Sequence, residues 1–87
     1  VTVYSHFMKK VEINREPVEL YKILKFEGLV PSGGEAKQVI ADGLVLVNKV
    51  VETRKRKKIF SGDVIEFEGD RFLISFENPG RLAEPGG

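Results

Sequence analysis

The sequence predicts a small α+β domain in which two packed helices are followed by a small, mostly antiparallel sheet. Between residues 18 and 43 the apolar residues recur with helical spacing and are bounded by capping and stopping signals. From residue 44 onward the apolar residues come in short runs of period two, separated by turn residues. Helices that come first and strands that follow them are typical of α+β architecture.

Length and composition limit the class of protein. The 87 residues suffice for one domain, and a hydrophobic content of 41% indicates a globular chain. The absence of cysteine excludes disulfides and thiolate metal sites, and it fits a reducing compartment. No apolar run approaches the roughly 20 residues that a bilayer span needs, and the start lacks the order of a signal peptide. We expect a cytoplasmic monomer with no membrane partner.

The two ends of the chain are expected to lie outside the main domain. Lys9–Ile13 alternates weakly and predicts a short edge strand within an N-terminal extension, residues 1–13. Met8 is a candidate native start, which would make residues 1–7 an addition. The main domain is expected over residues 14–77. Residues 78–87 are rich in proline and glycine, so we expect a flexible tail.

The first helix is predicted to begin within residues 14–17 and to end at Gly28. Pro17 suits the first helical position, where its missing N–H costs nothing. Glu16 and Glu19 would lie near the positive end of the helix dipole. The apolar face follows the i, i+3, i+4 rule and consists of Leu20, Ile23 and Leu24.

The second helix has a clear start and a clear end. Ser32 and Glu35 have the spacing of a capping box, and Asp42-Gly43 predicts the end. The buried stripe is expected to consist of Ala36, Val39 and Ile40. A brief loop joins this helix to the first, so we expect the two to pack as a pair.

Four strands are predicted after the helices, over residues 44–47, 50–51, 64–67 and 72–76. The first should have little solvent on either face, because Leu44 and Leu46 alternate with valines. Asn48-Lys49 forms the first turn, and lysine enters left-handed backbone less readily than glycine, so we expect strain or a longer turn. Residues 61–63 and 68–71 form the other turns. The aromatic residues of the last strands are expected to be core and not stacking platforms: Phe67, Phe72 and Phe76.

The net charge of +1 hides a strong segregation of charge. Between residues 49 and 58 six basic residues are opposed only by Glu52, which gives +5, so the rest of the chain carries −4. A cluster of this kind creates a local field that a polyanion would feel. The basic run consists of Arg54, Lys55, Arg56, Lys57 and Lys58.

The ordered set of motifs resembles the S4-type RNA-binding domain, and among its members the stand-alone bacterial proteins of the YbcJ type. The matching features are S-G-x-x-A-K at Ser32–Lys37, V-x-V-N at Val45–Asn48, E-T-R-K-R at Glu52–Arg56 and Gly62-Asp63 before an apolar strand. The resemblance runs from about residue 18 to residue 74. It implies the two-helix fold above and non-catalytic RNA binding.

The resemblance also implies a binding face on the second helix and the hairpin turn. Two positions depart from the family pattern. Gly33 stands where arginine often follows the capping serine, which removes a phosphate contact, and Lys49 replaces the usual glycine of the turn. Carried over by position, the face consists of Ser32, Gly33, Lys37, Gln38, Asn48 and Lys49.

The basic run at residues 54–58 is interpreted as a further RNA contact, because neutralised phosphates release counterions. Arg54 and Arg56 can fork onto a phosphate or stack on a base. A solvated loop and a nuclear-localisation signal are the alternatives. Lys37 could equally be a solvated lysine, Glu35 would compete with an anion at the helix start, and Tyr21 could belong to the core or to the surface.

No catalytic or metal site is predicted, and no cofactor or small-molecule substrate is expected. His6 is the only histidine, so no histidine-based triad or cluster can be built. Asp63 lies in a turn, where aspartate is common for backbone reasons. The leading hypothesis is a protein that binds structured RNA, such as ribosomal RNA. The alternatives are a module that docks on an acidic protein and an accessory domain of an RNA-modifying enzyme.

Overall fold

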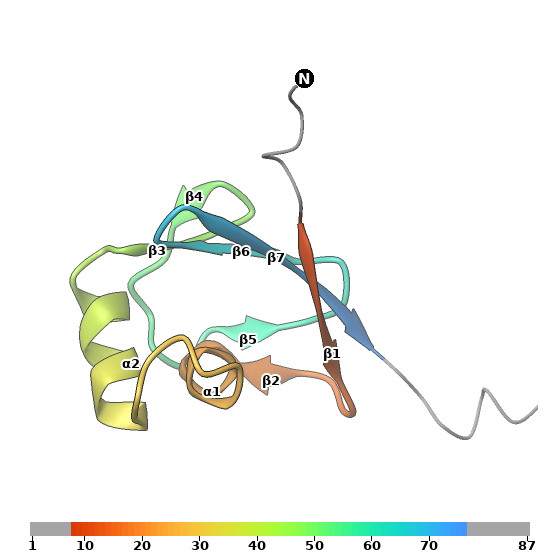
Figure 1. Ribbon diagram of the computed structural model, residues 1–87, viewed down its shortest axis with the longest axis horizontal. Helices are drawn as coiled ribbons and strands as arrows, with labels where there is room; N and C mark the ends of the chain where they lie inside the picture. The colour runs from red at the N-terminus through yellow and green to blue at the C-terminus, as the bar shows by residue number, and fades with distance from the viewer. Residues whose placement is uncertain (1–7, 77–87) are drawn as a thin grey trace, which may run out of the picture.

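The computed structural model describes residues 8–76, and Figure 1 shows the α1 helix and a two-stranded pair on one side of a larger sheet. The predictions for His6, residues 1–7 and residues 78–87 lie outside the described residues. The elements, in chain order, are β1 (Lys9–Ile13), β2 (Val18–Glu19), α1 (Leu20–Phe26), α2 (Gly33–Ala41), β3 (Val45–Val47), β4 (Val50–Val51), β5 (Lys58–Ile59), β6 (Val64–Phe67) and β7 (Asp70–Phe76).

The α+β class and the mostly antiparallel sheet are confirmed. The larger sheet has the order β1-β7-β6-β3-β4, and only β1 and β7 pair in parallel. A second sheet consists of β2 and β5, which pair antiparallel. The central strands of the larger sheet, β7, β6 and β3, follow the helices as predicted, whereas the short strand β2, which was not predicted, precedes α1. The predicted strand at Lys9–Ile13 is present and forms one edge of the larger sheet.

The core lies between the helices and the inner face of the larger sheet. Alternate residues of β3, β6 and β7 are buried, as period-two patterning requires. Phe67 and Phe72 belong to this core, as predicted. Phe76 is 36% exposed and Leu44 is 53% exposed, so both were wrongly assigned to buried positions. Phe76 is the last residue of β7 and Leu44 precedes β3, so neither lies inside the packed part of the sheet.

The predicted start of the first helix is wrong by several residues. Residues Val18-Glu19 are extended and pair with Ile59 and Lys58, and α1 begins only at Leu20. The Glu16 carboxylate accepts a hydrogen bond of 2.6 Å from the Ser61 N–H, so it does not lie at the helix N-terminus. A tertiary contact made by a distant loop therefore decides where α1 begins.

The predicted apolar face and end of α1 are confirmed. Its buried residues are Leu20, Ile23 and Leu24. The helix ends at Phe26 with Glu27 as the C-cap, and Gly28 follows with φ of +73°. Glycine enters this left-handed region without the clash that a Cβ would cause.

The α2 helix follows its sequence signals closely. Its N-cap is Ser32, whose Oγ accepts a hydrogen bond of 3.2 Å from the Glu35 N–H. The reciprocal bond to the Glu35 carboxylate is not formed within the described part of the chain. Ala36 and Ile40 are fully buried, whereas Val39, the third residue of the predicted stripe, is only partly buried. The helix packs against α1 and ends at Ala41, before Asp42 and Gly43. The predicted helix pair is confirmed.

Two tight turns of two residues each shape the sheet. Asn48 and Lys49 both have positive φ, 52° and 69°, and connect β3 directly to β4. The strain expected at Lys49 is therefore present, whereas the longer turn is wrong. Glu68-Gly69 repeats this geometry with φ of 53° and 85°. Because this turn takes two residues and not four, β7 begins at Asp70, two residues earlier than predicted.

Candidate nucleic-acid interface

The basic loop, defined as residues 52–57 between β4 and β5, is fixed to the start of α1 by its backbone. The first N–H groups of a helix have no partner within the helix. Here the Leu20 N–H donates to the Lys57 carbonyl at 2.9 Å, and the Tyr21 N–H donates to the Lys55 carbonyl at 3.2 Å. Three of the predicted RNA-binding residues, Lys55, Arg56 and Lys57, are thereby held beside the first turn of α1.

Glu52 shapes the basic loop through Arg54. The Glu52 carboxylate accepts the Arg54 backbone N–H at 2.9 Å and takes the guanidinium in a fork, with Nε at 2.9 Å and Nη2 at 3.2 Å. The hydrogen bond from the Arg54 side chain holds the pKa of the Glu52 carboxyl below its usual value, and partial burial opposes this effect. Arg54 is exposed, but its charge is compensated within the loop.

A set of cations surrounds the ring of Tyr21. The Lys37 Nζ lies 4.7 Å from the ring centroid, and the Lys22 Nζ and Arg56 Cζ each lie 6.0 Å from it. We call Tyr21, Lys22, Lys37 and Arg56 the Tyr21 cluster. Its members come from α1, α2 and the basic loop, which are separate in the sequence. Attraction between a cation and the face of an aromatic ring favours this arrangement.

Gly33 lies directly beside the Tyr21 cluster. A Cβ built at Gly33 would lie 3.8 Å from the Tyr21 Cε2 atom and 4.0 Å from the Lys25 Cδ atom, which are ordinary contact distances. Gly33 does not have a left-handed φ, so its backbone does not require glycine. A side chain at position 33 would therefore contact the edge of the Tyr21 ring.

Two of the predicted binding residues on α2 are engaged within their own helix. Ser32 caps the Glu35 N–H, as described above. The Gln38 Nε2 donates to the Asp42 Oδ1 at 3.0 Å, one helical turn further on. Both residues are exposed, and their hydrogen bonds stabilise the two ends of α2. Lys37 is the α2 residue whose side chain lies against Tyr21.

The turn residues Asn48 and Lys49 form a region apart from the Tyr21 cluster. The Asn48 Nδ2 donates to the Asp63 Oδ1 at 3.1 Å, and the Asn48 Oδ1 accepts from the Val64 N–H at 3.0 Å. Asp63 also accepts the Phe60 N–H at 2.8 Å, so it fixes a turn, as predicted. Lys49 lies beside Met8 and Arg71 in a shallow hollow. Asn48 therefore joins two turns, and Lys49 carries the exposed charge of this region.

The remaining predicted residues differ in exposure. Lys55, Arg56 and Lys58 are exposed, whereas Lys57 is half-buried. Lys58 is not in a loop, because it forms β5 and lies opposite Glu19 of β2. The structure therefore divides the basic run into a compensated Arg54, an exposed Lys55-Arg56 pair, and Lys58 on a strand.

Tyr21 and Lys22 were not among the predicted binding residues. Tyr21 lies beside the apolar face of α1, so the sequence did not decide whether it belongs to the core or to the surface. Nothing local in the sequence shows that Arg56, 35 positions further along, lies over its ring. The helical period of α2 did predict that Lys37 is a candidate binding residue, because Lys37 falls outside the buried stripe that contains Ala36 and Ile40.

The described residues offer little for metal binding or membrane insertion. Within residues 8–76, no three side chains of His, Asp or Glu come together in a way that could hold a metal ion. Neither α1 nor α2 has the length and hydrophobicity that a membrane-spanning helix requires.

Sequence comparison identifies the family of this chain. The S4 domain family model matches residues 11–75. Over 63 residues the chain is 46% identical to "Putative RNA-binding protein YbcJ" of Escherichia coli (strain K12), covering 71% of this chain and 90% of that protein. It is 37% identical over 59 residues to "Probable ribosome maturation protein RlbA" of Bacillus subtilis (strain 168), covering 68% and 83% of the two chains.

Solved structures share the fold. The solution structure of YbcJ from E. coli, described as revealing an αL motif involved in RNA binding, matches with a TM-score of 0.63 and 38% identity, covering 86% of this chain and 96% of that chain. Ribosomal protein S4e of the 30S subunit from Thermoplasma acidophilum matches with a TM-score of 0.62 and 26% identity, covering 77% of this chain and 35% of that chain. Since the family model covers most of the described residues and relatives match over two thirds of the chain, this chain belongs to the S4 domain family.

Proposed function

We propose that the protein is a non-catalytic monomer that binds structured RNA through the Tyr21 cluster and the exposed part of the basic loop. The observation that supports this proposal most is the Tyr21 cluster, where three cations from three segments lie within 6.0 Å of one ring centroid. Like charges repel each other, so their gathering without three matching carboxylates suits an anionic ligand.

The cluster supports phosphate binding because its charges are already positioned. Lys22 forms an ion pair with Glu19, in which the Lys22 Nζ lies 3.6 Å from the Glu19 Oε1. Lys37 and Arg56 have no carboxylate partner of this kind among residues 8–76. An arginine can take a phosphate in a fork and a lysine acts as a point charge, so the pair can hold one or two neighbouring phosphates.

The exposed charges predict how strongly salt should weaken binding. Arg54 is compensated by Glu52, which leaves the half-buried Lys37 and the exposed Lys55, Arg56 and Lys58 as the principal candidates for phosphate contact. About four phosphate contacts give a slope of log K against log salt of magnitude about 2.8 to 3.6, for single- and double-stranded RNA respectively. This slope is the quantitative signature of the proposed mode of binding.

The names of the relatives narrow the class of RNA. The B. subtilis relative is named for ribosome maturation, and an S4e protein of the 30S subunit shares the fold. A surface that reads charge and shape suits a hairpin or duplex region better than a particular base sequence. We therefore propose hairpins of ribosomal RNA as the ligand to test first.

Replacement of Arg56 by glutamate tests the proposal against a matched control. Arg56→Glu should weaken hairpin binding at low salt about tenfold or more, because it removes one charged contact and adds a repulsive charge. Lys10→Glu makes the same change of charge on β1, where Lys10 pairs with Glu12 at 3.6 Å on an exposed surface. Fluorescence anisotropy with a labelled RNA hairpin measures both affinities, and circular dichroism checks that both variants fold.

Equal loss of affinity in the two variants would mean that only net charge matters, and the cluster would have no special role. Binding that survives Arg56→Glu, or that ignores salt, would contradict the proposal. A salt-insensitive complex with an acidic protein, without RNA, would favour the protein-docking alternative.

A further inference from the structure

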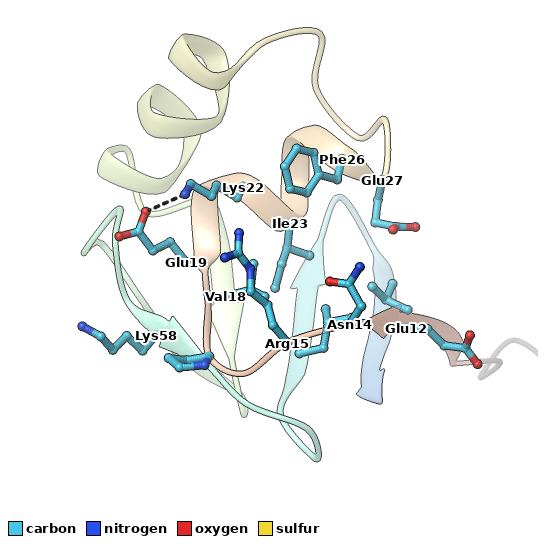
Figure 2. Close-up of a pocket in the computed structure, with 13 residues that line it drawn as sticks. Glu12, Asn14, Arg15, Val18, Glu19, Lys22, Ile23, Phe26, Glu27 and Lys58 are labelled. Atoms are coloured by element: carbon cyan, nitrogen blue, oxygen red, sulfur yellow. Dashed lines mark ion pairs between the residues drawn. The ribbon is translucent and has the colours of Figure 1, made fainter. Parts of the chain in front are cut away.

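A groove lies between α1 and the chain that leads from β1 to β2, next to the Tyr21 cluster. Its volume is about 620 Å³, within the range of pockets that hold a small molecule or a single nucleoside. Figure 2 shows Ile23 of α1 and Val18 of β2 within it, with Phe26 at one end. Ile13 and Ile23 are buried, so the floor of the groove is apolar.

Phe26 is the unusual residue of this groove. Its side chain is 67% exposed, although it is a large aromatic residue on a helix that packs against a core. The Lys25 Nζ lies 5.9 Å from its ring centroid. An exposed aromatic ring beside a cation is the combination on which nucleobases stack in proteins that bind single strands.

The charges along the groove are distributed unevenly. Arg15 and Lys58 lie toward the side of Glu19, whereas Glu27 and Glu12 lie toward the opposite side (Figure 2). Glu19 is paired with Lys22 and Glu12 with Lys10, each at 3.6 Å. Once these ion pairs are counted, the side near Glu19 is basic because of Arg15 and Lys58. The opposite side is acidic because of the Glu27 carboxylate.

The basic side of the groove continues the proposed RNA surface without a break. Lys22 belongs to the Tyr21 cluster and also lines the groove. Lys58 belongs to the basic run and lines it as well. An RNA backbone that follows these lysines reaches the mouth of the groove. Further phosphates would meet the Glu27 carboxylate, so a base, and not more backbone, suits the part of the groove beside Phe26 and Glu27.

We propose that the groove receives one unpaired nucleobase of the bound RNA, an inference that rests on the proposed function. Its phosphate lies near Lys22, Lys58 and Arg15, and its base stacks against Phe26. The Glu27 carboxylate only accepts hydrogen bonds, so it favours the exocyclic amino groups of adenine, cytosine and guanine over uracil, whose one base donor, N3–H, lies between two carbonyl oxygens that repel a carboxylate. The protein would thus bind the junction between a duplex and a single strand.

The experiment compares a blunt RNA hairpin with the same hairpin carrying a three-nucleotide overhang at either its 5′ or its 3′ end. For the wild-type chain, an overhang on one of these ends should raise affinity about fivefold or more, as expected for one stacked base. Phe26→Ala should abolish this gain and leave affinity for the blunt hairpin unchanged. Phe60→Ala removes another exposed aromatic residue, 48% exposed and not lining the groove, and should change neither value.

The variant Glu27→Gln provides a second, independent test, which concerns the base preference of the groove. Overhangs of adenosine or cytidine should bind more tightly than overhangs of uridine in the wild-type chain. Because glutamine both donates and accepts, Glu27→Gln should narrow that difference while it leaves the blunt hairpin unaffected.

The outcomes separate the two proposals. If neither overhang adds affinity, or if Phe26→Ala keeps the gain, the groove does not hold a base, although the hairpin still binds. If no hairpin binds at all, the proposed function itself fails. If Phe26→Ala removes binding to a protein partner and leaves the overhang gain intact, the groove is a protein-docking site and the inference is overturned.

Discussion

Tyr21 is the residue around which the candidate RNA-binding surface is organised. Its ring centroid lies 4.7 Å from the Lys37 Nζ and 6.0 Å from the Arg56 Cζ, so we propose it as a positioning residue for both cations. The ring, and not the hydroxyl, provides this attraction. The distinction between ring and hydroxyl can be tested directly.

Tyr21→Leu should weaken binding to an RNA hairpin about two- to fivefold, which corresponds to the loss of exposed cation–π contacts of about 0.5–1 kcal/mol. Leucine keeps most of the apolar contact with the core, so the fold should persist. Tyr21→Phe keeps the ring and should bind nearly as the wild type does. An equal loss in both variants, measured by anisotropy, would assign the effect to the hydroxyl.

Glu52 and Arg54 form the second informative pair at this scale. Glu52→Gln removes the compensating charge but keeps an oxygen that can accept the Arg54 N–H. Arg54 then becomes available to RNA, and the salt slope should steepen by about 0.7–0.9. Glu66→Gln is the matched control, because Glu66 pairs with Arg71 at 3.8 Å outside the basic loop. An unchanged slope in Glu52→Gln would show that Arg54 stays away from RNA even when it is free.

The same pair gives the loop a defined pH dependence. The folded-state pKa of Glu52 lies below its usual value, so the pair stabilises the loop fully above the usual carboxyl range. This contribution is lost as the pH falls through the lowered pKa. A nuclear magnetic resonance titration of the Arg54 Nε–H should show this transition in the wild type and not in Glu52→Gln.

Among the elements, the β3–β4 turn shows the clearest local strain. Lys49 adopts a φ of 69°, a region that costs residues with a Cβ about 1–2 kcal/mol. Lys49→Gly relieves this cost but loses more backbone entropy on folding, so the net gain in the free energy of unfolding should be up to about 1 kcal/mol. Lys49→Ala keeps the Cβ and should give no such gain. Urea unfolding with an unchanged m-value measures both variants.

Local signals predicted some elements well and others poorly. The α2 helix has its cap, its buried stripe and its glycine within twelve residues, so all three could be read from the sequence. The start of α1 could not be predicted from the sequence. Val18-Glu19 is extended because it pairs with Lys58-Ile59, which lies about 40 residues further along the chain. The strand β5 was not predicted for the same reason. It has only two residues, which are too few to show an alternating pattern in the sequence.

The candidate site was predicted as a list of positions but not as an arrangement. The basic run and Lys37 could be named from charge and helical period. Their meeting at Tyr21 depends on how the loop docks against α1, which is a tertiary contact. The compensation of Arg54 was hidden as well, because a formal charge count treats Glu52 as a single opposing charge and not as the partner of one particular arginine.

At the scale of the whole molecule, charge and packing are separated. The described core contains no buried polar or charged residue, so its residues provide stability and the surface is free to vary. The net charge of +1 arises from a basic region of +5 and a remainder of −4. A local concentration of positive charge speeds association with a polyanion at low ionic strength.

The bonds from the Leu20 and Tyr21 N–H groups to the carbonyls of Lys57 and Lys55 have one further consequence. The basic loop cannot detach without leaving the first turn of α1 unsatisfied, so loop and helix should open together as one cooperative unit. Much of the conformational entropy of the loop is therefore lost when the domain folds and not when a ligand arrives. A charged segment that could be interpreted from sequence as a solvated loop is thus preorganised, which raises the affinity that each of its contacts can give.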